Sequence, residues 1–312
     1  MKIVQFMPYF PPHKWGLETV WEEIGKFWAA KNLWESYIVT FDVWQDISNE
    51  ENIIFHNWKG IWYSRKWYNV YLISSFDLIH NFPFPKFWEK NFWVVLSIVK
   101  SLKVDIVTTN TRFFLSSLLG WFFAKFNKIK WIHIEYWSDY VKLSNKWLSF
   151  IAYLYDKILW ISIFKFSDKI LAISWASKKF INDNFTNKEV DVFYRWIDLP
   201  KINVEKKWNI RILFIWRLVA LKWVDLLIKA YSKLSNNIEL DIIWDWNENQ
   251  SLINLANDLW LNNKVNFLWY RDKDFIINYL SKNNTILVNP SYQEWMPTTV
   301  IEWLFYKNIV VA

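Results

Sequence analysis

Short apolar stretches alternate with amphipathic ones along most of the chain, and the alternation is clearest in the second half. Apolar runs of strand length lie at 210–215, 238–243, 264–268, 284–290 and 308–312, with helical patterns between them near 223–235, 248–260, 273–282 and 298–306. Buried strands separated by helices are typical of a parallel sheet with right-handed crossovers. The pattern therefore predicts a doubly wound α/β domain.

The first half repeats this alternation. Strands are expected at 2–6, 36–41, 77–82, 104–110, 128–136 and 169–174, and helices at 17–32, 87–102, 112–126 and 145–166. We interpret the polar stretch 198–209 as a linker. We therefore predict two Rossmann-like domains, 1–198 and 207–312, that face a cleft.

The end of the chain carries an expectation of its own. The chain stops at Ala312, directly after a predicted strand. A doubly wound domain would normally cover that strand with another helix. We expect the second domain to be truncated, or the sequence to be a fragment of a longer reading frame.

Composition excludes several classes of function. The chain has no cysteine, which excludes disulfides, thiolate catalysis and thiolate metal sites. Its four histidines, at 13, 56, 80 and 133, lack the spacing of metal ligands. The net charge of +7 is spread out without a basic run, which argues against nucleic acid as a partner. It still allows a mild attraction to anionic membranes or phosphorylated substrates.

The location of the protein follows from its apolar segments. The N-terminus begins directly in a strand and shows no signal-peptide pattern. We interpret the apolar regions 113–123 and 147–164 as core helices. The first is too short to span a bilayer, and the second contains Asp156 and Lys157. We expect a cytoplasmic protein and leave open a peripheral contact with the inner face of the membrane.

In open α/β sheets, ligands bind beyond the carboxyl ends of the strands, and four loops of this chain are informative there. In the loop 8–20, Gly16 and Thr19 lie near a helix start, where free N–H groups can hold an anion. A proline-rich surface loop is the equal alternative.

In the second loop, Arg217 and Lys222 lie between a strand and a helix. Two cations there suit a diphosphate, unless they are solvated surface charges.

The third loop follows the strand at 238–243 and reads Trp-Asp-Trp, where tight turns usually read Gly-Asp-Gly. Asp245 is the central residue of this turn. We therefore interpret Asp245 as a residue that shapes the turn.

The fourth loop, 291–303, contains two glutamates, Glu294 and Glu302, on either side of a predicted helix start. Residues 296–299 would expose backbone N–H groups, which suit phosphate charge. One carboxylate can hold sugar hydroxyls and the other a ribose. The alternative is a capping pattern with a solvated carboxylate, and the cations of the second loop weigh against it.

These loops, in this order, resemble those of the retaining glycosyltransferases of family 4, which have the two-domain GT-B fold. The family's second domain carries Gly-Arg-Leu…Lys-Gly, Gly-Asp-Gly and Glu-Gly-x-Pro…Glu, where this chain has WRLVALKW, WDW and EWMPTTVIEW. KWGLE resembles the Gly-Gly loop of the first domain, and FYRWID and FLWYRD resemble its Gly-Ile-Asp ending and the later Phe-Leu-Gly-Tyr. The resemblance spans nearly the whole chain, except a final helical segment that crosses back to the first domain.

The resemblance implies transfer of a sugar from a nucleotide-diphosphate sugar to a glycan or lipid-linked acceptor, with retention of configuration, in cell-envelope polysaccharide synthesis. The donor diphosphate would lie between Arg217, Lys222 and the helix start at 297–299. Glu294 would hold the donor sugar, and Glu302 the ribose. The other donor-site positions implied are Trp15, Gly16, Trp216, Asp245, Trp295, Met296, Pro297, Thr298 and Thr299. Family members need no metal or other cofactor, and no Asp-x-Asp motif is visible.

The acceptor would lie near Gly16 and the 133–139 loop. The family often has a histidine there, next to a glycine. Either His133 fills this role, as a fourth catalytic candidate beside Glu294, Arg217 and Lys222, or Tyr136 occupies the position.

Tryptophan stands where the family has glycine at positions 15, 196, 216, 223, 244, 246, 269 and 295. The chain has 26 Trp and 4 Gly, whereas average usage would give roughly 22 glycines. We hypothesise that the gene uses the codon UGA for glycine and was translated with a table that reads it as tryptophan. Trp88 and Trp93 lie in a predicted helix among other aromatic residues, and we expect them to be tryptophan in the natural protein.

Three alternatives stay open. A carbohydrate-binding module could stack exposed tryptophans on sugars, but its tryptophans would share one face. A GT-B nucleotide-sugar epimerase would need its own acid and base residues. A catalytically inactive sugar- or nucleotide-binding relative would result if Trp216 and Trp295 are genuine.

Overall fold

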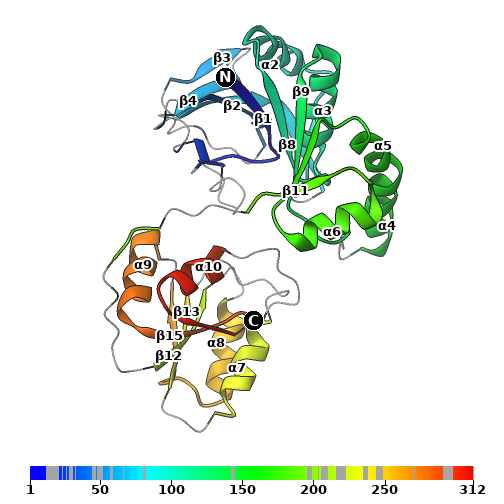
Figure 1. Cartoon of the computed structure of the whole chain (residues 1–312). Helices are drawn as coiled ribbons and strands as arrows, with labels where there is room; N and C mark the ends of the chain where they lie inside the picture. The colour runs from blue at the N-terminus through cyan, green and yellow to red at the C-terminus, as the bar shows by residue number, and fades with distance from the viewer. Residues whose placement is uncertain are drawn as a thin grey trace. The chain divides into compact units, whose positions relative to one another are not determined.

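The computed structural model divides the chain into two compact units, Met1–Asp198 and Leu199–Ala312. It describes residues 1–11, 21–22, 24–25, 27, 31, 33–43, 47, 52–56, 59–65, 67–79, 82–141, 145–194, 199–202, 204, 210–215, 223–234, 238–243, 249–269, 271–290 and 298–311. Each unit is built on a sheet whose central strands are parallel (Figure 1).

The described strands of the first unit form a nine-stranded sheet in the order β11-β10-β9-β8-β1-β2-β5-β4-β3. They are β1 Lys2–Phe6, β2 Glu35–Phe41, β3 Ile54–His56, β4 Lys59–Arg65, β5 Tyr68–Ile73, β8 Ile106–Asn110, β9 Lys130–Glu135, β10 Lys169–Ala172 and β11 Val190–Val192. The strands from β11 to β5 pair in parallel, whereas β4 pairs antiparallel with both β3 and β5. The predicted parallel sheet is therefore present, with an antiparallel extension that the sequence pattern did not predict.

The predicted strand 77–82 is wrong as a member of this sheet. The segment instead forms a separate antiparallel hairpin of β6 Ser75–Ile79 and β7 Phe82–Pro85. The physical reason is that Pro83 and Pro85 have no N–H to donate to a ladder, which confines them to an edge.

Helices pack on the face of the first sheet that carries Val4, Phe6 and Val107. They are α2 Lys90–Ser101, α3 Leu115–Asn127, α4 Lys146–Tyr155, α5 Ile161–Phe164 and α6 Trp175–Asn184, with a π-helical turn, Asp156–Trp160, between α4 and α5. α3 approaches the sheet closely at Gly120, where a Cβ atom would lie 2.4 Å from Thr109 Cγ2. In the predicted helix 17–32, the described residues 21–22, 24–25 and 27 are helical.

The second unit confirms the predicted alternation of strands and helices. Its strands are β12 Ile210–Ile215, β13 Glu239–Ile243, β14 Val265–Leu268, β15 Asn284–Val288 and β16 Ile309–Val311, all parallel in the order β14-β13-β12-β15-β16. Its helices are α7 Val224–Tyr231, α8 Asn249–Asp258, α9 Lys273–Lys282 and α10 Thr298–Phe305.

The helices of the second unit cover both faces of its sheet (Figure 1). Ile212 and Phe214 of β12 pack with α7 and α8, whereas Leu213 packs with α9 and α10. This division follows from the pleat, because successive side chains of a strand point to opposite faces. The continuous apolar run of β12 is therefore explained by its burial on both faces.

A polar cluster joins the amino-terminal halves of β12, β13 and β14. Arg211 Nε donates to Asp241 Oδ2 at 2.5 Å, and Arg211 Nη2 donates to Glu239 Oε2 at 2.6 Å. Asn266 Nδ2 donates to Asp241 Oδ1 at 2.8 Å, and the hydroxyl of Tyr279 on α9 also donates to Asp241. Asp241 is buried, so these donors compensate a carboxylate that has lost its water.

We expect Asp241→Asn to lower the free energy of unfolding by about 1.5–3 kcal/mol at pH 7, because charged hydrogen bonds are lost. Burial alone would raise the pKa of Asp241, but the hydrogen bonds from Arg211, Tyr279 and Asn266 hold it below the usual value. A lowered pKa contributes stability above the unfolded-state pKa of about 3.9, and this stability is lost as the pH falls through the folded-state pKa. Urea unfolding should therefore show the two proteins converging in acid.

Asp225→Asn is the matched control. Asp225 forms an exposed i,i+4 pair with Lys229 on α7, and its loss should cost less than about 0.5 kcal/mol. Equal losses in the two variants would contradict a stabilising role for the buried cluster.

Candidate functional site

Most of the donor-site candidates lie outside the described residues. They are Trp15, Gly16, Trp216, Arg217, Lys222, Asp245, Glu294, Trp295, Met296 and Pro297. Thr298 and Thr299 form the first turn of α10, and Glu302 is half-buried on the same helix. The described strands and helices nevertheless determine where the segments that carry these candidates begin and end.

The strand order of the second unit reverses beside β12. The chain runs from β12 to β13 and β14 on one side of β12, and then crosses to β15 and β16 on the other. β12 and β15 are parallel neighbours, with Leu213 opposite Leu287. In open α/β sheets this reversal marks the ligand-binding crevice, beyond the carboxyl ends of the two strands.

The candidate segments follow the strands at this reversal. The segment with Arg217 and Lys222 follows β12, and the segment with Glu294 follows β15 and leads into α10. The first N–H groups of α10 have no partner within the helix and carry its positive dipole end. Two cations and a helix N-terminus therefore belong to segments that leave adjacent strands, which is a suitable arrangement for a diphosphate.

The first unit has its own reversal, between β1 and β8. The residues that leave β8 there are Asn110, Thr111 and Arg112. Thr111 has a φ of 59°, which is strained for a β-branched residue. Ser117 Oγ donates to the carbonyl oxygens of Asn110 at 2.9 Å and of Thr111 at 2.6 Å. The start of α3 thus holds this strained corner in place.

Asn110 is also buried without compensation. Its side chain has no exposed surface, and neither Nδ2 nor Oδ1 has a hydrogen-bond partner. A buried unpaired amide costs about 1–3 kcal/mol, so it calls for an explanation. Asn110 is therefore a functional candidate that the sequence reasoning missed.

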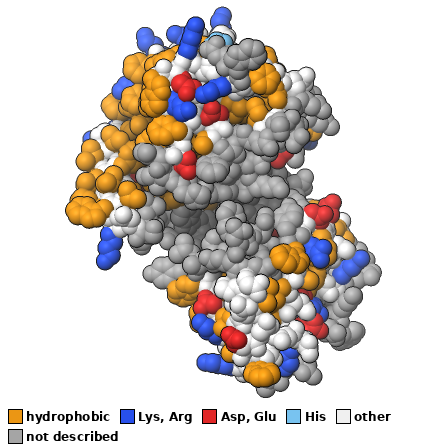
Figure 2. Space-filling view, turned by 180° about the vertical axis from the view of Figure 1, so that it is seen from behind, with side chains coloured by type: hydrophobic (Ala, Val, Ile, Leu, Met, Phe, Trp, Pro, Cys, Tyr) orange, Lys and Arg blue, Asp and Glu red, His pale blue; other side chains and the backbone are white. Residues whose placement is uncertain are grey.

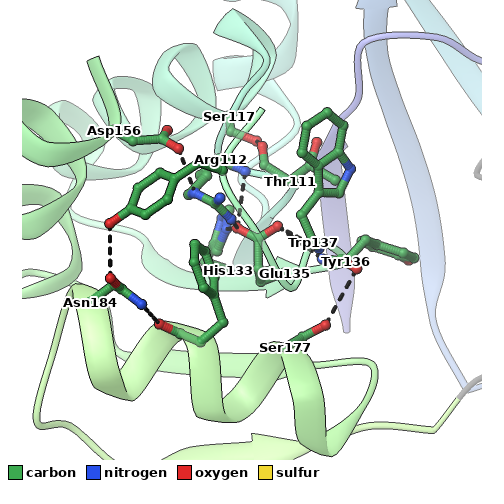
Figure 3. Close-up of polar contacts among 12 residues, drawn as sticks. Thr111, Arg112, Ser117, His133, Glu135, Tyr136, Trp137, Asp156, Ser177 and Asn184 are labelled. Atoms are coloured by element: carbon green, nitrogen blue, oxygen red, sulfur yellow. Dashed lines mark hydrogen bonds and ion pairs between the residues drawn. The ribbon is translucent and has the colours of Figure 1, made fainter. Parts of the chain in front are cut away.

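Arg112 turns inward and forms the centre of a buried ionic cluster (Figure 3). Its Nε donates to Asp156 Oδ2 at 3.0 Å, and its Nη1 lies 3.1 Å from Glu135 Oε2. The guanidinium also lies 4.8 Å from the ring centroid of Phe180 and 5.1 Å from that of Phe185. All three charged side chains are about 99% buried or more. The cluster joins the ends of β8 and β9 to the π-helical turn.

Two carboxylates share one guanidinium here, so their pKa values move apart. Burial would raise the pKa of Glu135, but the charge of Arg112 and the hydrogen bonds outweigh it and hold the pKa at about 2. Burial raises the pKa of Asp156 to about 6, since the attraction of Arg112 is partly offset by repulsion from Glu135. Asp156 is therefore the member of the cluster that takes up a proton in mild acid.

His133, the catalytic candidate of the first unit, lies in the core of that unit. Its side chain is fully buried within β9, where Nδ1 lies 2.8 Å from Thr109 Oγ1 and Nε2 lies 3.4 Å from Glu135 Oε2. The rings of Trp160 and Phe164 pack against it. Burial lowers the pKa of His133, so the ring is neutral at pH 7. The strand pleat directs this side chain into the core, and its role in catalysis stays a prediction.

Glu135 instead organises the residues that leave β9. Its Oε1 accepts hydrogen bonds from the backbone N–H groups of Tyr136 at 3.1 Å and Trp137 at 2.9 Å. Trp137 stacks on Phe113, with ring centroids 5.5 Å apart. Both Tyr136 and Trp137 are half-buried, whereas His133 is fully buried.

A signal for these residues was present in the sequence. Asn110, Thr111 and Arg112 follow a buried strand, as polar residues at a carboxyl end do in the loops that were singled out. The described residues contain no group of His, Asp and Glu side chains that could hold a metal ion.

Two described tryptophans have left-handed backbone conformations, Trp223 with a φ of 48° and Trp260 with a φ of 58°. Trp260 N donates to Asn257 O and Leu261 N donates to Ala256 O. This is a Schellman motif after α8, and its left-handed residue is usually glycine. Lys128 takes the same place after α3, so a side chain is tolerated there at a cost of about 1–2 kcal/mol.

We expect Asp156→Asn to remove a pH dependence of stability. With a folded-state pKa of about 6, native Asp156 binds a proton that the unfolded chain does not, so its contribution to stability falls as the pH rises through 6. The wild type should gain about 1 kcal/mol relative to the variant between pH 7 and pH 5. His133 has a lowered pKa, so its contribution to stability falls as the pH falls, opposite to that of Asp156. Both proteins contain His133, so this contribution cancels when they are compared by urea unfolding.

Asp183→Asn is the surface control, because Asp183 forms an exposed i,i+4 pair with Lys179. This variant should follow the wild-type pH profile within about 0.5 kcal/mol. Parallel profiles for Asp156→Asn and the wild type would refute the assignment of the proton to Asp156.

Known proteins are similar to this chain in sequence and in architecture. The family model described as Glycosyl transferases group 1 matches residues 197–312. An uncharacterised glycosyltransferase of Methanocaldococcus jannaschii, MJ1069, is 32% identical over 308 residues, which cover 94% of this chain and 75% of that protein.

Solved structures resemble the chain over its full length. The sucrose-phosphate synthase of Thermosynechococcus elongatus superposes with a TM-score of 0.70 at 15% identity, covering 99% of this chain and 80% of the other. Anabaena HepE in complex with UDP-glucose superposes with a TM-score of 0.63 at 15% identity, covering 100% of this chain and 80% of the other. The chain therefore belongs to the group 1 glycosyl transferases, and it has the GT-B fold.

Proposed function

We propose that this glycosyltransferase moves a sugar from a nucleotide-diphosphate sugar to a glycan or lipid-linked acceptor, with retention of anomeric configuration. The observation that carries the proposal is the reversal of strand order between β12 and β15. Segments bearing two cations, a carboxylate and a helix N-terminus leave these neighbouring strands. Such groups suit a leaving nucleoside diphosphate, whose developing charge must be stabilised.

In this proposal, each donor-side residue has a defined role. Arg217 and Lys222 hold the diphosphate together with the N–H groups at the start of α10. Glu294 holds hydroxyls of the donor sugar, and Glu302 holds the ribose. These side chains supply the charge stabilisation themselves, and we propose that no metal or other cofactor takes part. HepE was crystallised with UDP-glucose, so UDP-glucose is the first donor to test.

The acceptor site in this proposal lies at the reversal between β1 and β8. Tyr136 and Trp137 follow β9, the neighbour of β8, and Glu135 holds them through their backbone. The unpaired amide of Asn110 and the strained Thr111 mark the neighbouring strand end. We propose a role in assembling envelope polysaccharide or glycolipid in the cytoplasm, by analogy with bacterial enzymes of this kind.

We expect Arg217→Gln and Lys222→Gln each to lower kcat by about 100- to 1,000-fold, because each removes a charge that stabilises the leaving diphosphate. The measurement is release of nucleoside diphosphate from a panel of nucleotide sugars, beginning with UDP-glucose. The anomeric configuration of the product, read by proton NMR, tests retention directly.

The matched controls are Arg271→Gln and Lys229→Gln, which change an exposed arginine and an exposed lysine of the same unit. Both controls should keep the wild-type rate. Loss of activity in the controls, or inversion at the anomeric carbon, would contradict the proposed mechanism. Interconversion of sugars without an acceptor would point to an epimerase instead.

We further propose that glycine occupies several tryptophan positions of the natural protein. The left-handed Trp260, in a place where glycine is usual, supports this proposal, as does Trp223. A tryptophan at 295 would place the largest side chain where a donor sugar must approach the backbone.

Mass spectrometry of the tryptic peptide Asn283–Lys307, from protein made in its native host, is expected to find glycine at position 295. The same peptide reports the residue at 303. Peptides containing Trp88 and Trp93 serve as controls, since these positions should carry tryptophan. Tryptophan at 295 would argue for an inactive binding relative, with the donor site blocked.

A further inference from the structure

Helices α4 and α5, with the π-helical turn between them, form one continuous helical segment, Lys146–Phe164, of 19 residues. By length and composition it is apolar enough to cross a membrane, although 28% of its apolar window is buried inside the protein. Its inner face carries Ala152, Asp156, Trp160, Ile163 and Phe164, all buried. These positions recur every three to four residues, as expected for one side of a helix.

The outer face of this segment is apolar as well. Its exposed side chains are Trp147 at 76%, Phe150 at 52%, Ile151 at 58%, Leu154 at 37% and Ile158 at 65%. We call these five residues the outer face. Figure 2 shows hydrophobic side chains gathered at the edge of the first unit where α4 and α5 lie. Four of the five are not tryptophan, so the face is apolar whichever residue stands at 147.

The apolar surface has aromatic neighbours beyond the end of α5. Phe166 is 60% exposed, and Lys125 Nζ of α3 lies 4.3 Å from its ring centroid. Phe126, the residue after this lysine, is 80% exposed and stacks on Phe122. Exposed aromatic rings beside lysines are characteristic of surfaces that meet the head-group region of a bilayer.

Within 145–166 the exposed charges beside the outer face have one sign. Lys146 precedes it and Lys165 follows it, and both are exposed. Within 145–166, where every residue is described, the one carboxylate is Asp156, which is buried beside Arg112. The segment 145–166 therefore offers apolar area framed by cations and exposes no carboxylate of its own, whereas Asp168 just beyond it is exposed.

We propose that the outer face of α4 and α5 binds the surface of an anionic lipid bilayer. The apolar side chains enter the boundary between head groups and acyl chains, and Lys146 and Lys165 contact lipid phosphates. Apolar burial and electrostatic attraction to anionic lipids are the two terms that bind an interfacial helix. The charge complementarity decides for a lipid surface over a second copy of this basic chain, which would bring lysines against lysines.

The segment lies on the membrane in this proposal and does not span it. Asp156 on the inner face is paired with Arg112, and Trp160 packs against His133. If the segment spanned a bilayer, Asp156 and Trp160 would have to leave the core, and Arg112 would lose one of its two carboxylate partners. The proposal does not depend on the chemistry of sugar transfer.

The test is co-sedimentation of the full chain with vesicles of phosphatidylcholine alone or mixed with phosphatidylglycerol. We expect binding to the anionic vesicles that weakens with salt. Ile151→Ser combined with Ile158→Ser should weaken it by about tenfold or more, because two large apolar side chains no longer enter the lipid. Lys146→Gln combined with Lys165→Gln should reduce binding to anionic vesicles and its salt dependence.

The matched control is Leu226→Ser, which changes an exposed leucine of α7 in the second unit and should bind vesicles like the wild type. Far-UV circular dichroism and thermal melts verify that all variants fold. Three results would overturn the proposal: no binding of the wild type to anionic vesicles, equal binding by the Ile151→Ser/Ile158→Ser variant, or a dimer that the same substitutions dissociate.

Discussion

Parallel strand pairing is the constraint on which both halves of this molecule depend. A parallel strand must be reached by a crossover, so the carboxyl ends of successive strands meet at one edge of the sheet. Where the order reverses, at β12 and β15 and at β1 and β8, the two departing segments have no crossover helix between them. In the second unit these segments carry the charged candidates, and in the first they carry a strained corner. Topology therefore decides where the segments with the candidate residues leave each sheet.

The buried Arg112 cluster links three parts of the first unit that would otherwise be independent. Arg112 follows β8, Glu135 ends β9, and Asp156 begins the π-helical turn. Glu135 uses its second oxygen to hold the backbone that leaves β9. Asp156 lies on the inner face of the segment Lys146–Phe164 and anchors that face through Arg112. The opposite side of the same segment is the apolar outer face. A buried ion pair is weak evidence for stability in itself, but it imposes a specific arrangement on its partners. Here it relates a strand end that we assign to the acceptor site to a helix that we assign to the membrane.

The scarcity of glycine is a second constraint, because it determines which residues occupy left-handed backbone positions. Left-handed positions exist in any fold with many turns, and another residue must occupy them if glycine does not. In the described residues, lysine, asparagine and threonine occupy some of these positions, and tryptophan occupies two. Trp260 is 93% exposed, so the fold tolerates it without overpacking.

The sequence by itself determined the two-unit α/β architecture, because periodic apolar runs such as β12 and α9 leave one way to bury their faces. It also indicated which segments carry the donor-site candidates, through the motifs around Arg217 and Glu294. Only the tertiary structure decided which way side chains point. It buried His133, because the pleat of β9 turns it inward, and it joined Arg112, Glu135 and Asp156, which are far apart in the sequence. It also left the outer face of α4 and α5 exposed, since periodicity cannot tell which of two apolar faces finds a partner.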